Sequence, residues 1–534
     1  MRYYIDCNSK YGRITKRHPL LAYEPDELLR EMARCNIHAA VTENQVSTHY
    51  AYRPGNRDLI AQCKENSRLL PLALCPPTYK WEQREGVDYL PYLCDQVSGI
   101  VLRPRTCAFS LDPRIMEDFA GILVEKKRPL VIPTAELESF IHLANLLEAF
   151  PELPVVMTSL SWGYNRMLFP LLERHANLHF DMSDDHLNDL LPFTKRHFGL
   201  DRLLFGSGYP GRGMGTLKAL IEYADVSEDD KNLVAHGNAC RLFGLDATAL
   251  APYEGSQLDP IAEAMDNGRP LREWFIFDSH GHIADEDDDC ISQLVMPNAE
   301  RDSIAKKLER LGVDKVILSS WEGIKTGGAR ANETVYKAMT AYPGMMYGYA
   351  TANPNYDGDI DNALANHEER GFIGIKPYAI LHGKLTDPGY QPWFAYGNQR
   401  KMFVLVHSGS QDVVDQVAAL APKYPDLYFL MAHSGADMAT AESNVALAKQ
   451  NDNVFLEITY TASTRGSIEY MVREVGSPRV LFGTDLPMRD PAPQLAWVAY
   501  AEISMEDKVN ILGENMHRIV ERVLPPNGRP PSDS

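Results

Sequence analysis

The stretch Phe275-Ile-Phe-Asp-Ser-His-Gly-His-Ile283, halfway along the chain, joins an apolar run to two histidines that stand one residue apart. Alternate side chains of a β-strand point to the same face, so His280 and His282 are expected to share one side of this segment. If that side faces the axis of a barrel, the two imidazoles converge on one point. The pair is then half of a metal site; otherwise it is an exposed pair at the end of a strand.

Four later apolar runs also end in polar residues that can bind a metal. They are Gly374-Ile-Lys376, Met402-Phe-Val-Leu-Val-His407, Leu427-Tyr-Phe-Leu-Met-Ala-His433 and Val480-Leu-Phe-Gly-Thr-Asp485. Buried parallel strands read as continuous runs of Val, Ile, Leu and Phe, and in a (β/α)8 barrel the chemistry lies at their carboxyl ends. Each of these residues alone is more typical of a structural polar group, but together they predict a metal site at the mouth of one barrel.

The first half of the chain repeats the second half. Leu203-Leu-Phe-Gly-Ser-Gly-Tyr-Pro210 is similar to Val480-Leu-Phe-Gly-Thr-Asp-Leu-Pro487, and the separation between further matching positions stays nearly constant. A repeat whose period is a whole domain indicates a tandem duplication rather than a solenoid. In the second half strand-like runs alternate with helical patterns, which is typical of a parallel sheet. The predicted fold is therefore α/β, with two tandem (β/α)8 TIM-barrel-like domains.

Local composition sets the expected domain boundaries. The barrels are predicted at residues 1–255 and 275–524, with a linker at residues 256–274 and a disordered tail at residues 525–534. Proline, glycine and polar residues mark the linker, and the composition of the tail is that of a disordered segment.

The first copy has lost every candidate ligand. At the positions that match His280, His282, Lys376, His407, His433 and Asp485, it carries in the same order Asn8, Lys10, Val101, Thr134, Ser159 and Gly208. An ammonium group such as that of Lys10 adds positive charge and offers no lone pair to a metal. The first half is therefore predicted to be a degenerate barrel without metal, a pseudoenzyme domain joined to a catalytic one.

The composition excludes several classes of protein. The 534 residues are 45% apolar and 23% charged, and the net charge of −19 argues against a nucleic-acid surface. The chain has no apolar run of the ~18 residues that a membrane span needs, and its start lacks the pattern of a signal peptide. Eight scattered cysteines without CxxC pairs suit reduced thiols. We therefore expect a cytoplasmic protein that acts on a small molecule, with neither nucleic acid nor membrane as a partner.

Four motifs of the second half match those of a known family. They are Asp278-Ser-His-Gly-His282, Val406-His407-Ser-Gly, Ala432-His433-Ser-Gly and Gly483-Thr-Asp485-Leu-Pro487. With these motifs, roughly residues 270 to 524 resemble the amidohydrolase superfamily, in its branch of aminocarboxymuconate-semialdehyde decarboxylase-like and related TIM-barrel hydrolases. The resemblance implies one metal ion per chain, bound by His280, His282, His407 and Asp485. It also implies that His433 acts as an acid/base, and Asp485 could shuttle a proton as well.

The kinds of ligand indicate the metal. Histidine nitrogen and aspartate oxygen point to Zn²⁺, with Mn²⁺ or Fe²⁺ as alternatives. Lys376 has two interpretations, because in binuclear relatives a lysine on this strand is carboxylated and bridges two metals, whereas as an ammonium it could contact a substrate carboxylate. We expect one metal.

The loops around the barrel mouth supply candidate substrate contacts. These are Trp321, Tyr378, Tyr460 and Arg489, although each could equally be an ordinary loop residue. The first copy keeps Arg212 at the position of Arg489, which favours a structural salt bridge for this arginine.

Three functions compete for this set of residues. The first is a metal-dependent hydrolase of a small lactone, ester or amide, since a bound divalent ion brings the pKa of its water toward ~7. The second is a lyase that decarboxylates an aromatic or unsaturated acid non-oxidatively. The third is a binding protein that holds a metal without turnover, and the intact His433 and Asp485 argue against it. We favour the hydrolase, with the decarboxylase as its alternative.

The degenerate barrel is expected to act as a scaffold. Relatives in this branch commonly form homodimers, and two fused barrels can supply the same interface within one chain. Fusion raises the effective concentration of one barrel beside the other and so lowers the cost of association. We therefore expect an intramolecular pseudo-dimer of barrels, with further homo-oligomers left open.

Overall fold

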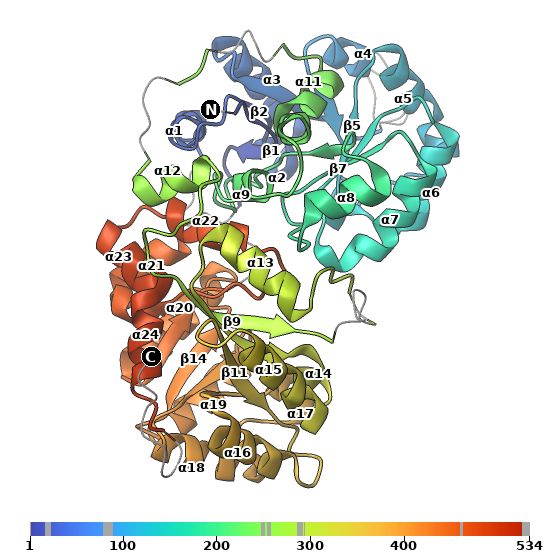
Figure 1. Cartoon of the computed structure of the whole chain (residues 1–534). Helices are drawn as coiled ribbons and strands as arrows, with labels where there is room; N and C mark the ends of the chain where they lie inside the picture. Colours follow the sequence, from blue (N-terminus) through green and yellow to red (C-terminus); the bar gives the residue numbers. More distant parts are fainter. Residues whose placement is uncertain are drawn as a thin grey trace. The chain divides into compact units, whose positions relative to one another are not determined.

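A computed structural model describes residues 2–15, 23–77, 89–246, 251–253, 258–285, 292, 294–459 and 463–525. The chain divides into two compact units, Met1–Asn267 with Ser292–Val295, and Gly268–Ile291 with Met296–Ser534. Each unit holds one eight-stranded parallel sheet in which the strands follow chain order. In Figure 1 the first sheet and its helices run from blue to green and the second from yellow to red. The predicted fold of two tandem (β/α)8 barrels is confirmed.

The first barrel alternates strands and helices from its start. Its strands are β1 Ile5–Tyr11, β2 Ala39–Asn44, β3 Leu69–Leu74, β4 Gly99–Val101, β5 Leu130–Pro133, β6 Val155–Thr158, β7 Leu178–Asp181 and β8 Leu203–Leu204. Its helices are α1 Pro25–Arg34, α2 Val46–His49, α3 Tyr52–Glu65, α4 Tyr89–Cys94, α5 Pro113–Glu125, α6 Phe140–Ala149, α7 Asn165–Arg174, α8 Leu190–Phe198, α9 Lys218–Glu222, α10 Glu228–Asn232 and α11 Asn238–Phe243. A parallel bridge between Ser9 and Tyr209 joins the first strand to the segment after the last one.

The second barrel repeats this order. Its strands are β9 Phe277–Ile283, β10 Lys315–Ser320, β11 Met346–Thr351, β12 Gly374–Lys376, β13 Phe403–His407, β14 Tyr428–Ala432, β15 Val454–Glu457 and β16 Val480–Leu481. Its helices are α13 Arg301–Leu311, α14 Trp321–Lys325, α15 Ala329–Ala341, α16 Asp359–Arg370, α17 Ala379–His382, α18 Gln391–Gln399, α19 Gln411–Leu420, α20 Met438–Gln450, α21 Ser467–Val475, α22 Ala492–Tyr500, α23 Met505–Val509 and α24 Asn515–Glu521. A bridge between Gly281 and Leu486 occupies the place of the Ser9–Tyr209 bridge.

The segment between the barrels carries one helix. Helix α12, Pro260–Asp266, begins after Asp259, whose side chain accepts from the backbone of Ile261 and Ala262. The division between the two compact units falls just after this helix, between Asn267 and Gly268. The predicted disordered tail lies outside the described residues except for Pro525. None of the described helices is long and apolar enough to cross a membrane.

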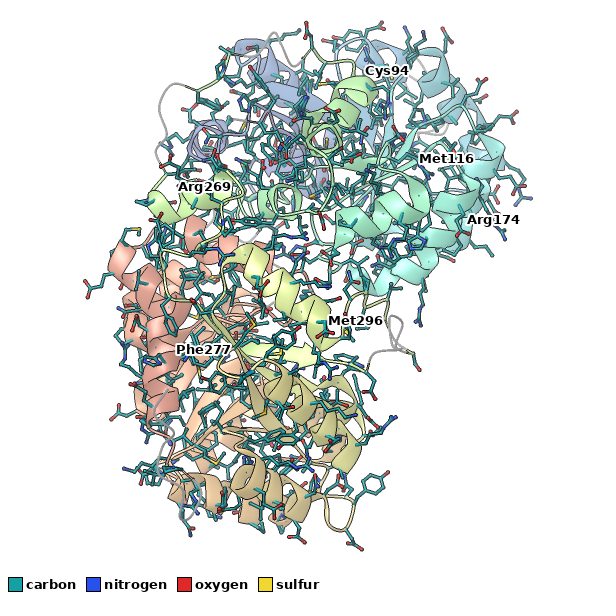
Figure 2. All side chains as sticks on the ribbon, in the orientation of Figure 1. Cys94, Met116, Arg174, Arg269, Phe277 and Met296 are labelled. Carbon is teal, nitrogen blue, oxygen red and sulfur yellow. The ribbon has the colours of Figure 1, made fainter. Side chains whose placement is uncertain are left out.

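Alternate strand residues fill the interior of each barrel. In the second barrel Phe403 and Leu405 of β13 pack with Leu430 and Ala432 of β14 in one buried cluster. The period of two along a strand gives His407 the same direction as Phe403 and Leu405. The apolar layers therefore aim the polar strand ends at the barrel mouth. Figure 2 labels two residues of the helical layer of the first barrel, Cys94 of α4 and Met116 of α5; both side chains are fully buried.

The two copies share unusual local structure at matching positions. Ser159 and His433 have left-handed backbone angles, with φ of 55° and 64°. Asn238 and Asn515 each follow a single π-helical turn and donate to two backbone carbonyls near the start of the last strand, at 2.7 Å. These shared features agree with the tandem duplication that the sequence repeat predicts.

Candidate metal centre

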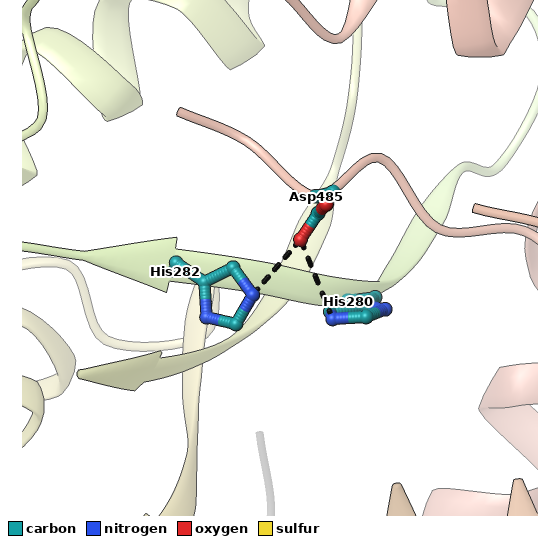
Figure 3. Close-up of side chains that lie close together, drawn as sticks. All are labelled: His280, His282 and Asp485. Carbon is teal, nitrogen blue, oxygen red and sulfur yellow. Dashed lines mark ion pairs between the residues drawn. The ribbon is translucent and has the colours of Figure 1, made fainter. Parts of the chain in front are cut away.

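Three side chains of the second barrel form a compact group of metal-ligating type. His280 and His282 come from β9, and Asp485 comes from the loop after β16 (Figure 3). The Asp485 Oδ1 atom lies 2.9 Å from His282 Nε2 and 3.6 Å from His280 Nε2. One ligand atom from each residue lies within 4.8 Å of the others, and all three side chains are buried. Two imidazoles and a carboxylate without thiols fit a divalent metal ion.

The local chain explains why these residues meet. Phe277 faces the barrel interior, so regular alternation along β9 would turn His280 and His282 away from it. A register shift between β9 and β10 adds one residue after Asp278 and turns both histidines toward the barrel axis. A Cβ atom on Gly281 would lie 2.8 Å from the Leu318 side chain and 2.9 Å from that of Val316, so a larger residue between the two histidines would force these side chains to shift.

The loop after β16 is tied to β9 by hydrogen bonds. The Asp278 Oδ1 atom accepts from the backbone N–H groups of His280, at 2.9 Å, and Thr484, at 3.1 Å. The backbone N–H of Asp485 donates to the His280 carbonyl at 2.7 Å. Asp485 itself has φ of 63°, a conformation that aspartate tolerates better than most residues. The carboxylate is therefore held over the histidine pair.

His407 and His433 form a second pair beside this group. His407 ends β13 and His433 follows β14, and their Nδ1 and Nε2 atoms lie 3.1 Å apart. The His433 ring centroid is 5.2 Å from that of His280. His433 Nδ1 lies 2.9 Å from the carbonyl oxygen of Thr459. Because a carbonyl only accepts, this nitrogen carries the proton. Neither residue belongs to the group within 4.8 Å.

Burial governs the charges in this site. It lowers the pKa of His433 to about 4, so the ring is neutral near pH 7. Burial also lowers the pKa of Lys376, at the end of β12, to about 8, while Asp485 and Glu457 oppose the shift. Burial alone would raise the pKa of Asp485. The hydrogen bond from His282 and the nearby positive groups instead hold the pKa of that carboxyl well below its usual range.

Glu457 is a site residue that our reading of the sequence missed. It ends β15, is fully buried, and places Oε2 2.9 Å from His280 Nδ1. Burial raises the pKa of its carboxyl to about 8. The signal was present, since Val454-Phe-Leu-Glu457 is one more apolar run that ends in a possible ligand.

Three of the four predicted substrate contacts lie beside His282, His407 or Asp485. The Trp321 ring centroid is 5.9 Å from that of His282, and the Tyr378 ring centroid is 5.2 Å from that of His407. The Arg489 Nε atom lies 3.5 Å from Asp485 Oδ2. Tyr460 lies outside the described residues.

Lys325 is a further neighbour of the site that the sequence did not indicate. Its ammonium lies over two aromatic rings, 4.7 Å from the ring centroid of Trp321 and 5.5 Å from that of Tyr378. It therefore links two of the predicted substrate contacts through cation–π interactions.

Ion pairs occupy the mouth of the first barrel. The Arg103 guanidinium lies 2.7 Å from a Glu43 oxygen and 3.5 Å from a Glu136 oxygen, and Lys10 Nζ lies 4.0 Å from the other Glu43 oxygen. Asn8, at the position of His280, donates to Ser159 Oγ at 3.0 Å. Within the described residues, the only group that could hold a metal is the one in the second barrel.

Comparison with known proteins places most of the chain in a known family. A family model described as amidohydrolase matches residues 105–245 and 277–522, which is most of the chain and includes parts of both barrels. The chain belongs to the amidohydrolase family. As a member of that family it is an enzyme, and the predicted superfamily is confirmed.

Solved structures match a little under half of the chain at low sequence identity. A 2,6-dihydroxybenzoate decarboxylase from Rhizobium is 15% identical, with 46% of this chain and 99% of that chain covered and a TM-score of 0.39. A dihydroxybenzoic acid decarboxylase from Polaromonas, solved with manganese, is 16% identical, with 46% and 97% covered and a TM-score of 0.36. A 5-carboxyvanillate decarboxylase from Novosphingobium aromaticivorans, also complexed with manganese, is 14% identical, with 47% and 97% covered and a TM-score of 0.39. No curated protein matches the chain in sequence.

Proposed function

We propose that the second barrel is a metal-dependent hydrolase that acts on a small lactone, ester or amide. The observation that carries this proposal is the convergence of His280 Nε2, His282 Nε2 and an Asp485 oxygen within 4.8 Å at a barrel mouth. A divalent ion bound there, Zn²⁺ or alternatively Mn²⁺ or Fe²⁺, would polarise a substrate carbonyl and lower the pKa of water.

The hydrogen bonds support His407 as the fourth ligand. Because His433 Nδ1 donates to the Thr459 carbonyl, the neutral ring can only accept at Nε2. His407 must then donate from Nδ1, which leaves a lone pair on its Nε2 atom. A lone pair on Nε2 is what a metal ligand needs.

His433 is the proposed acid/base. Its Nε2 atom is the one that can take up a proton, and the Thr459 carbonyl fixes the other nitrogen. Proton transfer by a positioned side chain contributes about 10²–10⁴-fold to an enzymatic rate. Asp485, beside His282, is the second group placed to hold a proton during the reaction.

The surroundings favour a small anionic substrate. Lys376 Nζ lies 3.3 Å from His280 Nε2, and Arg489 lies beside Asp485, so two cationic side chains border the ligand group. Trp321 and Tyr378 place aromatic rings next to His282 and His407. A carboxylate on the substrate would find its partners among these cations.

The same observation supports decarboxylation as the alternative. Lys376 is buried beside the ligand group, and a substrate carboxylate brought against it would leave water. Loss of its hydration destabilises a carboxylate and so favours the release of carbon dioxide.

We expect the purified enzyme to hydrolyse members of a panel of lactones and esters without releasing carbon dioxide from hydroxybenzoates. Hydrolysis is followed by proton release and decarboxylation by trapped carbon dioxide, with His280→Ala as the inactive control in both assays. Carbon dioxide release by the wild type alone, without hydrolysis of any panel member, would establish the decarboxylase instead.

We also expect the full-length chain to carry about one equivalent of a divalent transition metal, as four-ligand sites of this kind do. His280→Ala should lose it, because the variant removes one of the converging donors. Asn8→Ala changes the matching position of the first barrel and should retain the metal. Elemental analysis measures all three proteins. Two equivalents in the wild type would favour a carboxylated Lys376 that bridges two ions.

A further inference from the structure

The carboxylate of Glu457 is fixed at both of its oxygens. Oε2 lies 2.9 Å from His280 Nδ1, and Oε1 accepts from the backbone N–H of Thr459 at 2.6 Å. Both Glu457 and His280 are fully buried. A Cβ atom on Gly483 would come within 2.4 Å of Oε1, so the glycine leaves the space that the carboxylate fills. Glu457 is thus aimed at one nitrogen of one candidate ligand.

We propose that Glu457 is a positioning residue that holds His280 with its proton on Nδ1 and the lone pair of Nε2 directed into the metal site. This inference rests on the proposed metal-dependent function. A neutral imidazole carries one proton, and a metal takes the nitrogen that lacks it. Burial raises the pKa of Glu457 to about 8, but the charge of a divalent ion bound nearby would favour its ionised form, and an ionised carboxylate accepts the Nδ1–H bond. Partners of this kind fix the tautomer and orientation of metal-ligating histidines.

Contacts on the other side of the ring agree with this tautomer. Lys376 Nζ lies 3.3 Å from His280 Nε2, and a lysine amine offers N–H donors toward that nitrogen. The Asp485 oxygen is 3.6 Å from Nε2, which is too long for a hydrogen bond. The Nε2 atom therefore faces a hydrogen-bond donor, which is consistent with a lone pair and no proton on this nitrogen.

In the first barrel the acid at the end of the matching strand is an aspartate, which is shorter than glutamate by one methylene. Asp181 ends β7 as Glu457 ends β15, and its carboxylate likewise lies against a glycine, with Oδ2 2.4 Å from a Cβ on Gly206. Its Oδ1 atom accepts from the backbone of Ser159, at 3.0 Å, and from Ser183 Oγ, at 2.9 Å. Asp181 therefore hydrogen-bonds to Ser159 and Ser183 nearby, whereas Glu457 reaches the imidazole of His280, which belongs to β9.

His282 has a different partner, which supplies a comparison within the same site. Ser319 Oγ lies 2.9 Å from His282 Nδ1. A hydrogen bond to a charged group is roughly twice as strong as one between neutral groups. A hydroxyl can also either donate or accept, so it does not select a tautomer as a carboxylate does. Removal of Glu457 should therefore affect metal binding more than removal of Ser319.

Glu457→Gln tests this proposal with little change of shape. The Thr459 N–H keeps the amide oxygen at the position of Oε1, so the NH₂ group faces His280 Nδ1 and donates to it. The proton of His280 is then forced onto Nε2, where it blocks the metal. Selective ¹⁵N labelling of histidine reports the tautomer in the metal-free, full-length protein, read above the pKa of about 8 that burial gives Glu457. The His280 signal is assigned from its loss in His280→Gln.

The expected results separate positioning from a merely structural role. In the wild type His280 should carry its proton on Nδ1, and in Glu457→Gln on Nε2. The Kd for Co²⁺, followed by visible absorption, should rise by about 10–100-fold in Glu457→Gln. Ser319→Ala should raise it less, and Asp181→Asn in the first barrel should leave it unchanged. Glu457→Asp should also weaken Co²⁺ binding, because the shorter side chain withdraws from the ring.

Either measurement can overturn the proposal. An unchanged His280 tautomer in Glu457→Gln would refute it, as would an unchanged Kd for Co²⁺. Because the tautomer is read without metal, its failure is distinct from failure of the proposed function. If the wild type bound no Co²⁺ but the tautomer switched, Glu457 would still position His280 while the metal-dependent function would be wrong.

Discussion

Replacement of His433 by alanine is expected to lower turnover by about 10²–10⁴-fold, the contribution of a positioned acid/base, and to leave much of the metal bound. The reason is the place of His433 beside the ligand group rather than within it. Its Nδ1 atom is bound to the Thr459 carbonyl and its Nε2 atom to His407, so both nitrogens already have hydrogen-bond partners within the protein. Steady-state kinetics and elemental analysis of the same preparation measure the two effects together.

His280→Ala is the matched variant for this prediction. It removes a donor of the ligand group, so both metal and turnover should be lost. The pair of variants also tests a competing role for His433, in which it only orients His407 through their 3.1 Å contact. Equal loss of metal from the two variants would assign His433 to metal binding and would strengthen the two-metal alternative with a carboxylated Lys376.

Arg103→Met is expected to destabilise the first barrel by about 3–5 kcal/mol, as does removal of one partner from other buried ion pairs. Arg103 is buried and pairs with Glu43 and Glu136, both buried as well. Methionine keeps much of the volume but leaves the two carboxylates with the ammonium of Lys10 as the nearest cation, 4.0 Å from Glu43. Urea unfolding of the full chain, with a probe in each barrel, measures the change.

The pH dependence of this effect has a definite sign. Burial alone would raise the pKa of Glu43, but Arg103 and Lys10 hold it below the usual value for a glutamate. The stability that this ion pair contributes is therefore present above the unfolded pKa and is lost as the pH falls through the folded pKa. The difference between wild type and Arg103→Met should shrink on acidification.

Arg114→Met provides the control for Arg103→Met. Arg114 also forms a close ion pair, 2.6 Å from Asp112, but its side chain is 89% exposed. Water and salt screen such a pair, so this variant should unfold like the wild type. If the two variants behaved alike, burial of the Arg103 network would not contribute to the stability of the first barrel.

The fold and the candidate ligands were accessible from the sequence because both depend on local patterns. Apolar runs such as Phe403–Val406 predict buried strands wherever they occur, and a polar residue at the end of each run predicts what faces the barrel mouth. The tandem repeat presents the same strand pattern a second time in the first half of the chain. It shows that Lys10 replaces His282 and that Asn8 replaces His280.

The partners of those residues were decided only by the tertiary structure. Glu457 meets His280 because closure of the second barrel brings the end of β15 near the first strand, β9, from far along the chain. The ion pairs of Lys10 and Arg103 with Glu43 likewise join residues from three strand ends of the first barrel. A strand pattern fixes the direction of a side chain, but its length and the charges around the mouth decide what it touches. The sequence therefore indicated where the candidate ligands lie, whereas barrel closure determined which side chains hold those ligands in place.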